Sequence, residues 1–503
     1  MVATTLIPLI LPIFFAISLG FAVFTTIYRL FLHPLSKFPG PRLAAITQWY
    51  QFYHDVIRGG KYLSMIPGFE AEYESKIIRI GPNSLHINNP EYYMEAFTES
   101  SYRKAPCFWE SLPWPNALAN ITDPKKHSLE RRMFAPLLNG SSVEMLMPSL
   151  ATRLQQLGEV LDRCAEAGDA IELQKYFVLI AADMTSEATF GVAESLSDNQ
   201  EELDETANLY QSFLIHSILF QYFPLLSNLL DILPTWFVNM LIPAYVKLRK
   251  NCEQQVESIR KRRNEGKTVS HRGQPTLCDI ILDCPPEKYW RPIDDDYIIN
   301  NAIMFSVGGA TSLAYAVQAA TFHLLTHPPV LARLKLELKE SDYYVKNWDF
   351  VKIQQLEYLT AVIRETFRLT PSVPGFLPRV VPDTGAMVAG QFIPGGTCFS
   401  VTQQSVNMDT GLFPEPHLFK PERWLGESGL AMRKWTIAFG KGRHYCVGQK
   451  LAYLQVYGCL AYMFSEFELE LDDPQISTMQ SDSYLGSVNR ESIKFKIRGR
   501  NSC

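Results

Sequence analysis

The first 28 residues of the chain carry no charged side chain, and the run from Leu6 to Tyr28 is predominantly apolar. A helix over these 23 residues would be about 34 Å long, enough to cross a bilayer. The first basic residues follow the run, so the positive-inside rule leaves the rest of the chain in the cytosol. We therefore predict a membrane anchor over residues 1–33. The alternative is a cleavable signal peptide, but its usual basic start and small-residue cleavage site are not clear here.

The next segment, residues 34–44, holds three prolines and a glycine, which predict a stiff, non-helical hinge. Apolar and polar side chains then alternate between Ile77 and Ile87 around a Gly-Pro pair, which predicts a β-hairpin. Asn89 and Pro90 form a helix start. The remaining globular part, residues 45–503, is expected to form one catalytic domain.

Helical periodicity dominates this globular part. Asp123 caps a short helix that carries His127 and Arg131 one turn apart on the same face. Longer helices are predicted over Val143–Ala165, Leu203–Leu230, Phe237–Arg263, Tyr297–Leu325 and Leu359–Thr370. The pattern indicates a mainly α fold with small β-sheets.

The helix predicted over Tyr297–Leu325 is almost uncharged, so it belongs in the core. The sequence Gly308-Gly-Ala-Thr-Ser312 interrupts it, because two glycines weaken a helix and the two hydroxyls could turn inward. Tight packing of a continuous helix against small residues is the alternative.

Composition narrows the functional classes. With 47% hydrophobic residues the chain can build one large core, and a net charge of −5 gives no reason to expect a nucleic acid partner. Nine scattered cysteines argue against a disulfide framework and for a reducing compartment.

One cysteine stands in a distinctive context, the glycine-punctuated loop from Phe439 to Gly448. A helix that begins just after Cys446 directs unpaired N–H groups toward the sulfur, and this favours a thiolate. A single thiolate without a second Cys or His at zinc spacing suits haem, which supplies four ligands of its own. Phe439 is expected to pack near the thiolate. A buried structural cysteine in a glycine turn is the alternative.

The loop pattern F-x-x-G-x-x-x-C-x-G closely resembles the haem-binding loop of the cytochrome P-450 family. The resemblance implies the cytochrome P-450 fold, haem b (iron protoporphyrin IX) as cofactor, and Cys446 as the axial ligand of its iron. It also implies that His127, Arg131 and Arg379 bind the haem propionates. His444 stands where the family usually has a propionate-binding Arg, so pairing there is expected to be weaker or pH-dependent.

Two further motifs resemble the family. Glu365 and Arg368 match its E-x-x-R pair, joined by Arg423 in a buried network that supports the cysteine loop; a weak surface pair is the alternative. Thr311 and Ser312 match the oxygen-activation motif, with Thr311 the best candidate for proton delivery. Ala310 stands where the family usually has an acid, which leaves the proton path open.

The resemblance also implies a substrate pocket of mainly apolar character. Its expected lining residues are Met304, Gly308, Val373, Phe376 and Leu485.

These features predict a monooxygenase that takes electrons from NADPH through an NADPH–cytochrome P-450 reductase and oxidises a lipophilic small molecule. Segments such as His33–Arg42 resemble fungal members of the family. They favour a role in secondary metabolism, with a terpenoid as the expected substrate class, and a single-pass location in the endoplasmic reticulum membrane. Because of Ala310, a haem-thiolate isomerase, peroxide-using enzyme or reductase is the second hypothesis. A haem-binding sensor is the third.

Overall fold

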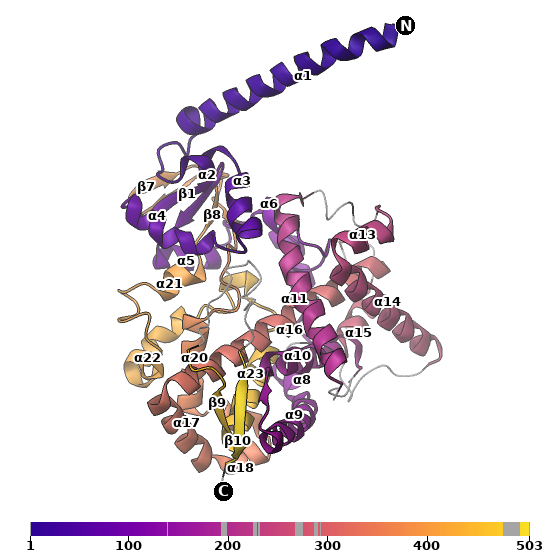
Figure 1. The fold of residues 1–503 in the computed structure, drawn as a ribbon, viewed down its shortest axis with the longest axis vertical. Coiled ribbons are helices and arrows are strands. Elements are labelled where there is room, and N and C mark those ends of the chain that lie inside the picture. Colours follow the sequence, from indigo (N-terminus) through magenta and orange to yellow (C-terminus); the bar gives the residue numbers. More distant parts are fainter. Residues whose placement is uncertain are drawn as a thin grey trace.

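The computed structural model describes residues 2–137, 139–192, 199–224, 229, 232–266, 275–285, 290–291, 293–475 and 493–501. Helix α1 (Val2–Ile27) projects away from a helix-rich body that has a smaller, sheet-containing part next to it (Figure 1). The stretch Ile13–Leu32 is apolar enough to cross a membrane, and none of it is buried inside the protein. These findings fit the predicted anchor helix.

Residues 33–41 are non-helical, as expected from their prolines, and the following helix α2 begins at Arg42, inside the predicted hinge. Pro39 packs onto the sheet, because its carbonyl accepts a hydrogen bond of 2.7 Å from the Arg79 backbone N–H. The chain between anchor and body is therefore fastened to the first strand.

The larger sheet joins segments that lie far apart in the sequence, in the order β1-β2-β8-β5-β3. Strands β1 (Ile77–Gly81) and β2 (Ser84–Ile87) form the predicted hairpin, which is confirmed. The other three are β3 (Arg103–Lys104), β5 (Arg379–Val380) and β8 (Cys398–Ser400). A three-stranded sheet holds β4 (Ala170–Ile171), β10 (Phe495–Arg500) and β9 (Phe467–Leu471), and β6 (Ala386–Val388) pairs with β7 (Gln391–Ile393).

Helix α16 (Asp295–Thr326) runs through the centre of the helical part, as its apolar sequence predicted. The Asp294 side chain caps it by accepting a hydrogen bond of 2.8 Å from the Tyr297 N–H. Around it pack α10 (Leu173–Phe190), α14 (Pro243–Asn264), α20 (Glu357–Leu369) and α23 (Gln449–Glu466). This arrangement buries α16 within the largest hydrophobic cluster.

The other α-helices surround these elements. They are α2 (Arg42–Ile46), α3 (Trp49–Phe52), α4 (Ile66–Glu72), α5 (Pro90–Thr98), α6 (Pro106–Trp109), α7 (Pro124–Phe134), α8 (Gly140–Glu144), α9 (Met147–Ala167), α11 (Gln200–Tyr222), α13 (Thr235–Leu241), α15 (Leu277–Leu282), α17 (Pro328–Glu340), α18 (Asp342–Lys346), α19 (Phe350–Ile353), α21 (Gln403–Asn407) and α22 (Gly426–Met432).

Three of the predicted helices are shorter or divided in the structure, because a proline lies at each break. Helix α11 ends at Tyr222 instead of continuing to Leu230, and Phe223 before Pro224 leaves the helical conformation. The predicted helix Phe237–Arg263 is broken at Pro243, and Val143–Ala165 is divided between α8 and α9.

The predicted interruption of α16 was also wrong, because the helix is continuous through residues 308–312. Gly309 lies against α10, where an added Cβ would collide with the Thr185 hydroxyl. This glycine therefore permits close helix packing, which is the alternative that the sequence left open.

Candidate active site

The loop that presents Cys446 is shaped by its glycines. Gly440 and Gly442 have positive φ angles of 71° and 65°, and a Cβ on Gly442 would collide with the Phe97 carbonyl. The Cys446 N–H donates a hydrogen bond of 2.7 Å to the Phe439 carbonyl. With Gly448 as the cap of α23, the loop places Cys446 just before the helix N-terminus, as predicted.

The thiol of Cys446 lies deep in the protein and still faces accessible space. Cys446 is an exposed residue, yet desolvation by the surrounding protein is the largest influence on its pKa, which is raised. The Gly448 N–H acts in the opposite direction but is outweighed. The N–H groups at the helix start therefore favour the thiolate, in the direction expected, while burial opposes it; bonding to a metal would remove the proton outright.

Phe439 lies at the start of the loop with its ring in an aromatic group. Its centroid is 5.3 Å from that of Phe367 on α20 and 5.1 Å from that of Tyr453 on α23. The ring thus joins the cysteine loop to the two helices behind it.

Basic side chains from four segments gather beside the loop. His127 and Arg131 come from α7, Arg379 from β5, His444 from the loop itself and Lys104 from β3; we call these five the basic cluster. His127 Nε2 is 3.4 Å from His444 Nδ1. Arg131 Nη1 donates to the Tyr445 carbonyl at 2.8 Å. The structure therefore brings all four predicted propionate partners together.

Lys104 was missed by sequence reasoning. It is 4% exposed, its Nζ donates to the Ala119 carbonyl at 2.8 Å, and the same nitrogen lies over the Trp109 ring. It stands opposite Arg379 in the β3–β5 ladder. No local pattern could have found it, because that register joins residues 275 positions apart in the chain.

The basic cluster is electrostatically unbalanced. Burial, then Arg379 and Arg131, hold the pKa of Lys104 well below its usual value. Burial and Lys104 lower the pKa of His127 to about 3, and burial lowers that of Arg379 to about 10. No carboxylate among the described residues contributes to these shifts.

Several donors of the cluster have no protein partner. Nε and Nη1 of Arg379 and Nε2 of His444 are buried without a hydrogen bond to any described residue. Buried polar groups in proteins are normally satisfied. Unpaired donors and excess positive charge together fit a ligand with two carboxylates, and the two propionates of haem meet that requirement.

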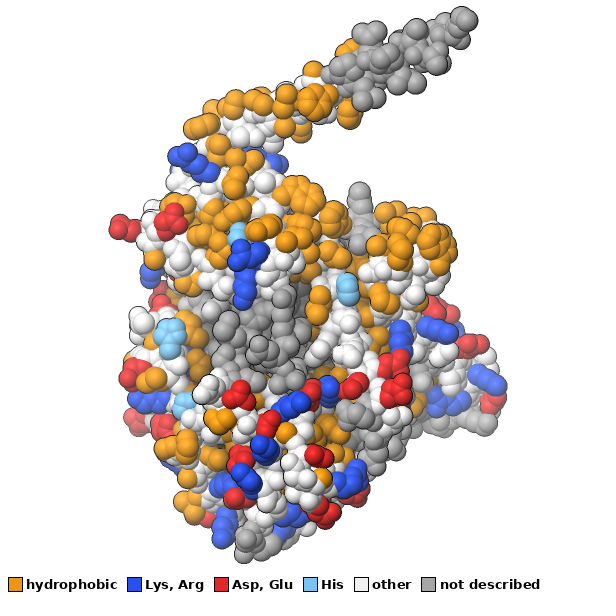
Figure 2. All heavy atoms as spheres, in the orientation of Figure 1, with side chains coloured by type: hydrophobic (Ala, Val, Ile, Leu, Met, Phe, Trp, Pro, Cys, Tyr) orange, Lys and Arg blue, Asp and Glu red, His pale blue; other side chains and the backbone are white. Residues whose placement is uncertain are grey.

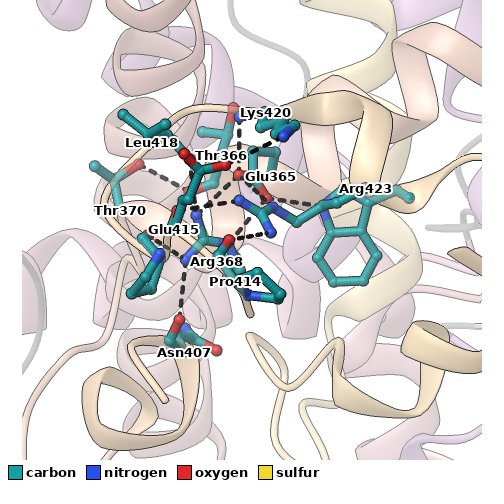
Figure 3. A network of polar contacts seen from close by, with 12 residues as sticks. Glu365, Thr366, Arg368, Thr370, Asn407, Pro414, Glu415, Leu418, Lys420 and Arg423 are labelled. Carbon is teal, nitrogen blue, oxygen red and sulfur yellow. Dashed lines mark hydrogen bonds and ion pairs between the residues drawn. The ribbon is translucent and has the colours of Figure 1, made fainter. Parts of the chain in front are cut away.

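The network around Glu365 is buried, which rules out a surface pair. Glu365 is 0% and Arg368 3% exposed. Figure 3 shows both side chains on α20 facing the segment 407–424. Arg368 forms two bonds to the carboxylate, of 2.9 and 2.8 Å, and Arg423 forms a third, of 3.0 Å.

This network also fixes backbone. The remaining donors of Arg368 reach the carbonyls of Asn407, Pro416 and Leu418, and those of Arg423 reach Pro414 and Glu415. Trp424 Nε1 and the Lys420 backbone N–H also donate to Glu365, at 2.8 and 3.0 Å. One carboxylate thus organises the segment that precedes the cysteine loop.

Helix α16 presents a partly accessible face at its middle. Gly308 is exposed, with no heavy atom within 4 Å of a Cβ built there. Thr311 and Ser312 are half-buried, and their hydroxyls donate to the carbonyls of Val307 and Gly308, at 3.2 and 2.8 Å. Ala310 is fully buried in the core. The hydroxyls therefore bond to their own helix and have not turned away from it.

The predicted pocket residues that the structure describes come from α16 and from the segment just before β5. Met304 is half-buried on α16, where its sulfur accepts a hydrogen bond of 3.3 Å from the Ala119 N–H. Val373 is also half-buried. The Phe376 ring instead packs against Tyr62 and His86, at centroid distances of 6.1 and 6.3 Å. Leu485 lies outside the described residues.

Comparison with known proteins matches this arrangement. The fold is similar to a crystal structure of a cytochrome P-450, with a TM-score of 0.69 over 86% of this chain and 94% of that one, at 19% identity. The cytochrome P-450 monooxygenase aneF of Aspergillus aculeatus is 32% identical, covering 89% of this chain and 91% of that protein. The monooxygenase phqM of Penicillium fellutanum is 34% identical, covering 92% and 87%.

The family model for cytochrome P-450 matches residues 77–497, most of the chain. Members of this family use a haem iron, which agrees with a cysteine loop flanked by unpaired cations. The chain belongs to the cytochrome P-450 family and is a cytochrome P-450 monooxygenase.

Proposed function

We propose that this enzyme inserts one atom of O₂ into a lipophilic secondary metabolite of a fungus, using electrons that NADPH supplies through an NADPH–cytochrome P-450 reductase. The observation that carries the proposal is the joint placement of Cys446 and the basic cluster, since haem needs both a ligand for its iron and polar partners for its two propionates. The fungal origin of the relatives supports the setting.

The cofactor in this proposal is haem b. Cys446 would be the axial ligand, and Lys104, His127, Arg131, Arg379 and His444 would hold the propionates, with Phe439 packed behind the loop. When bound, the haem iron supplies the centre at which O₂ is bound and reduced. Glu365, Arg368 and Arg423 act at a distance by holding the segment before the loop.

Thr311 and Ser312 are proposed to hold protons or water near this centre. Both hydroxyls lie on the accessible stretch of α16, one turn beyond carbonyls that accept from them. Without an acid at position 310, a water chain or a substrate hydroxyl must complete the proton path. We therefore expect proton delivery to be the step most sensitive to the substrate.

The substrate is proposed to be apolar, and a terpenoid is the class we would test first. Met304 and Gly308 on α16, together with Val373, offer a surface with few polar groups. Phe376 would contribute from the side of the sheet, because its ring packs on Tyr62 and His86.

Location in the endoplasmic reticulum membrane, with the catalytic domain (45–503) on the cytosolic side, completes the proposal. Figure 2 shows apolar side chains gathered at the end of the molecule from which α1 extends. We call these residues the apolar patch; they are Leu43, Trp49, Ile57, Ile232, Trp236 and Met240, each at least 60% exposed. Such a surface beside an anchor helix suits the interface of a bilayer.

The test is turnover of a terpenoid panel by the purified full chain with reductase, NADPH and ¹⁸O₂. One ¹⁸O atom per product molecule is expected. A product that carries no label would overturn the proposal.

The second candidate is a haem-thiolate enzyme that does not follow normal O₂ activation, which means an isomerase, a peroxide-using enzyme or a reductase. It is favoured by Ala310, which stands where the family usually has an acid. That candidate predicts product formation without reductase or without O₂. Turnover that strictly needs both excludes it.

A further inference from the structure

Two cysteines outside the proposed haem site face each other across the sheet. Cys107 on α6 and Cys398, the first residue of β8, lie 291 positions apart in the chain, with their sulfur atoms 4.0 Å apart. We propose that Cys107 and Cys398 form a reversible dithiol–disulfide pair that exchanges with glutathione disulfide. We further propose that the disulfide restrains the strands β3 and β8 next to Lys104 and Arg379.

Both thiols line a recess of about 490 Å³ near the base of the anchor helix. Its wall also includes Arg29, Trp49 and Tyr222. Cys107 is exposed and Cys398 is partly so. A guanidinium in the wall matches the carboxylates of glutathione. By contrast, Cys252, Cys278 and Cys459 are buried.

The two sulfurs are chemically unequal. Cys107 is the more exposed of the two thiols. A hydrogen bond from Cys398 also lowers the pKa of Cys107, while Cys107 and burial raise the pKa of Cys398. Cys107 is therefore the nucleophile, and Cys398 is the resolving thiol.

The reaction balances as two exchanges. The Cys107 thiolate attacks one sulfur of glutathione disulfide, which forms a mixed disulfide and releases one glutathione thiolate. Cys398 then loses its proton and attacks the Cys107 sulfur, which closes the protein disulfide and releases the second glutathione. The protein loses two electrons and two protons, and these reduce glutathione disulfide to two glutathione molecules.

The position of the pair gives the bond a structural consequence. Cys398 pairs with Val380 in the β5–β8 ladder, directly after Arg379, and Cys107 follows Lys104 by three residues. A Cys107–Cys398 bond would therefore tie β3 and the loop after it to β8. The effect on cofactor retention rests on the proposed function, whereas formation of the bond does not.

The experiment uses the full-length, haem-loaded enzyme in nanodiscs, equilibrated in glutathione buffers from fully reduced to fully oxidised. Remaining thiols are alkylated, and peptides are mapped by mass spectrometry without reduction. We expect a cross-linked Cys107–Cys398 peptide, loss of two alkylatable thiols per chain, and full reversal by dithiothreitol. Cys164→Ser is the matched control, since Cys164 is partly exposed on α9, and it should leave the cross-link unchanged.

Cys398→Ser separates the two steps. It should accumulate the glutathione mixed disulfide on Cys107, whereas Cys107→Ser should leave Cys398 unmodified. The proposal is overturned if the wild type keeps both thiols in fully oxidised buffer, or stops at the mixed disulfide. Haem transfer to apomyoglobin should be slower for the oxidised wild type than for the reduced form. Equal rates with the cross-link present would overturn the proposed restraint of the strands, but not the formation of the disulfide.

Discussion

Lys104 is a buried basic residue whose surroundings disfavour its charged form. It is buried beside Arg379 and Arg131, and both the desolvation and the like charges penalise its protonated form. A charge kept in such a place is explained if an anion completes the site.

Replacing Lys104 with Met tests this explanation. The neutral side chain has a similar length, so packing against Trp109 should survive while one partner of the proposed propionates is lost. We expect haem to leave the variant about tenfold faster, the equivalent of ~1.4 kcal/mol, measured as haem transfer to apomyoglobin. Lys125→Met, at an exposed position on α7, is the control. Equal transfer rates for Lys104→Met and wild type would remove Lys104 from the site.

Local spacing revealed some members of the site and could not reveal others. His127 and Arg131 were predictable because four residues make one helical turn, whereas Lys104 depends on a strand register. Similarly, the helix and glycines around Cys446 were visible in the sequence, but the desolvation that raises its pKa arises only when distant segments close around it.

At the scale of elements, α16 was predicted within two residues at its start and one at its end, because an uncharged run with an acidic cap is a strong local signal. The roles of its two adjacent glycines were not readable, since they depend on α10. Gly309 contacts Thr185, whereas Gly308 faces open space.

The two glycines therefore predict opposite results. Gly309→Ala should destabilise the enzyme by ~1–3 kcal/mol through overpacking, and Thr185→Ala in the same chain should restore most of the loss. Gly308→Ala should be neutral or stabilising by up to ~1 kcal/mol, since alanine is the better helix former. Urea unfolding of these three variants and the wild type measures this. A Gly309→Ala enzyme as stable as wild type would contradict the packing described for α10 and α16.

His323 near the end of α16 predicts a pH dependence of stability. Its ring stacks on Phe419 with centroids 4.6 Å apart, and burial, His327 and Arg368 lower its pKa to about 3. In the unfolded chain the His323 imidazole takes up a proton below about pH 6.5, whereas in the folded chain it stays neutral down to about pH 3. The folded state is therefore fully stable, as far as this group is concerned, above pH 6.5, and it loses stability as the pH falls toward 3.

At about pH 5 the loss from this one group should be ~2 kcal/mol relative to neutral pH. His323→Phe keeps an aromatic ring but cannot take up a proton, so its unfolding free energy should fall less between pH 7 and pH 5. The control is His417→Phe, at an exposed position. Identical pH profiles for His323→Phe and wild type would show that His323 does not carry this dependence.

For the whole molecule, the anchor was predictable because a run of apolar residues needs no tertiary contact to be recognised. The apolar patch was not predictable in this way, because its members belong to two stretches, residues 43–57 and 232–240, that are far apart in the chain. Prolines at 224 and 243 likewise divided helices that periodicity alone had joined.

Removal of residues 1–33 should weaken membrane association without abolishing it. The truncated enzyme should still float with phosphatidylcholine vesicles, and replacement of Trp49 and Trp236 by Ser should release most of it. If the truncated enzyme stays entirely in the soluble fraction, the apolar patch does not bind membranes.

The absorption spectrum of the reduced enzyme under carbon monoxide tests whether Cys446 ligates a haem iron. The wild type should show the red-shifted band of thiolate-ligated haem, and Cys446→His should show the band of imidazole-ligated haem. A thiolate band that persists in Cys446→His, or is missing from the haem-loaded wild type, would contradict this ligation.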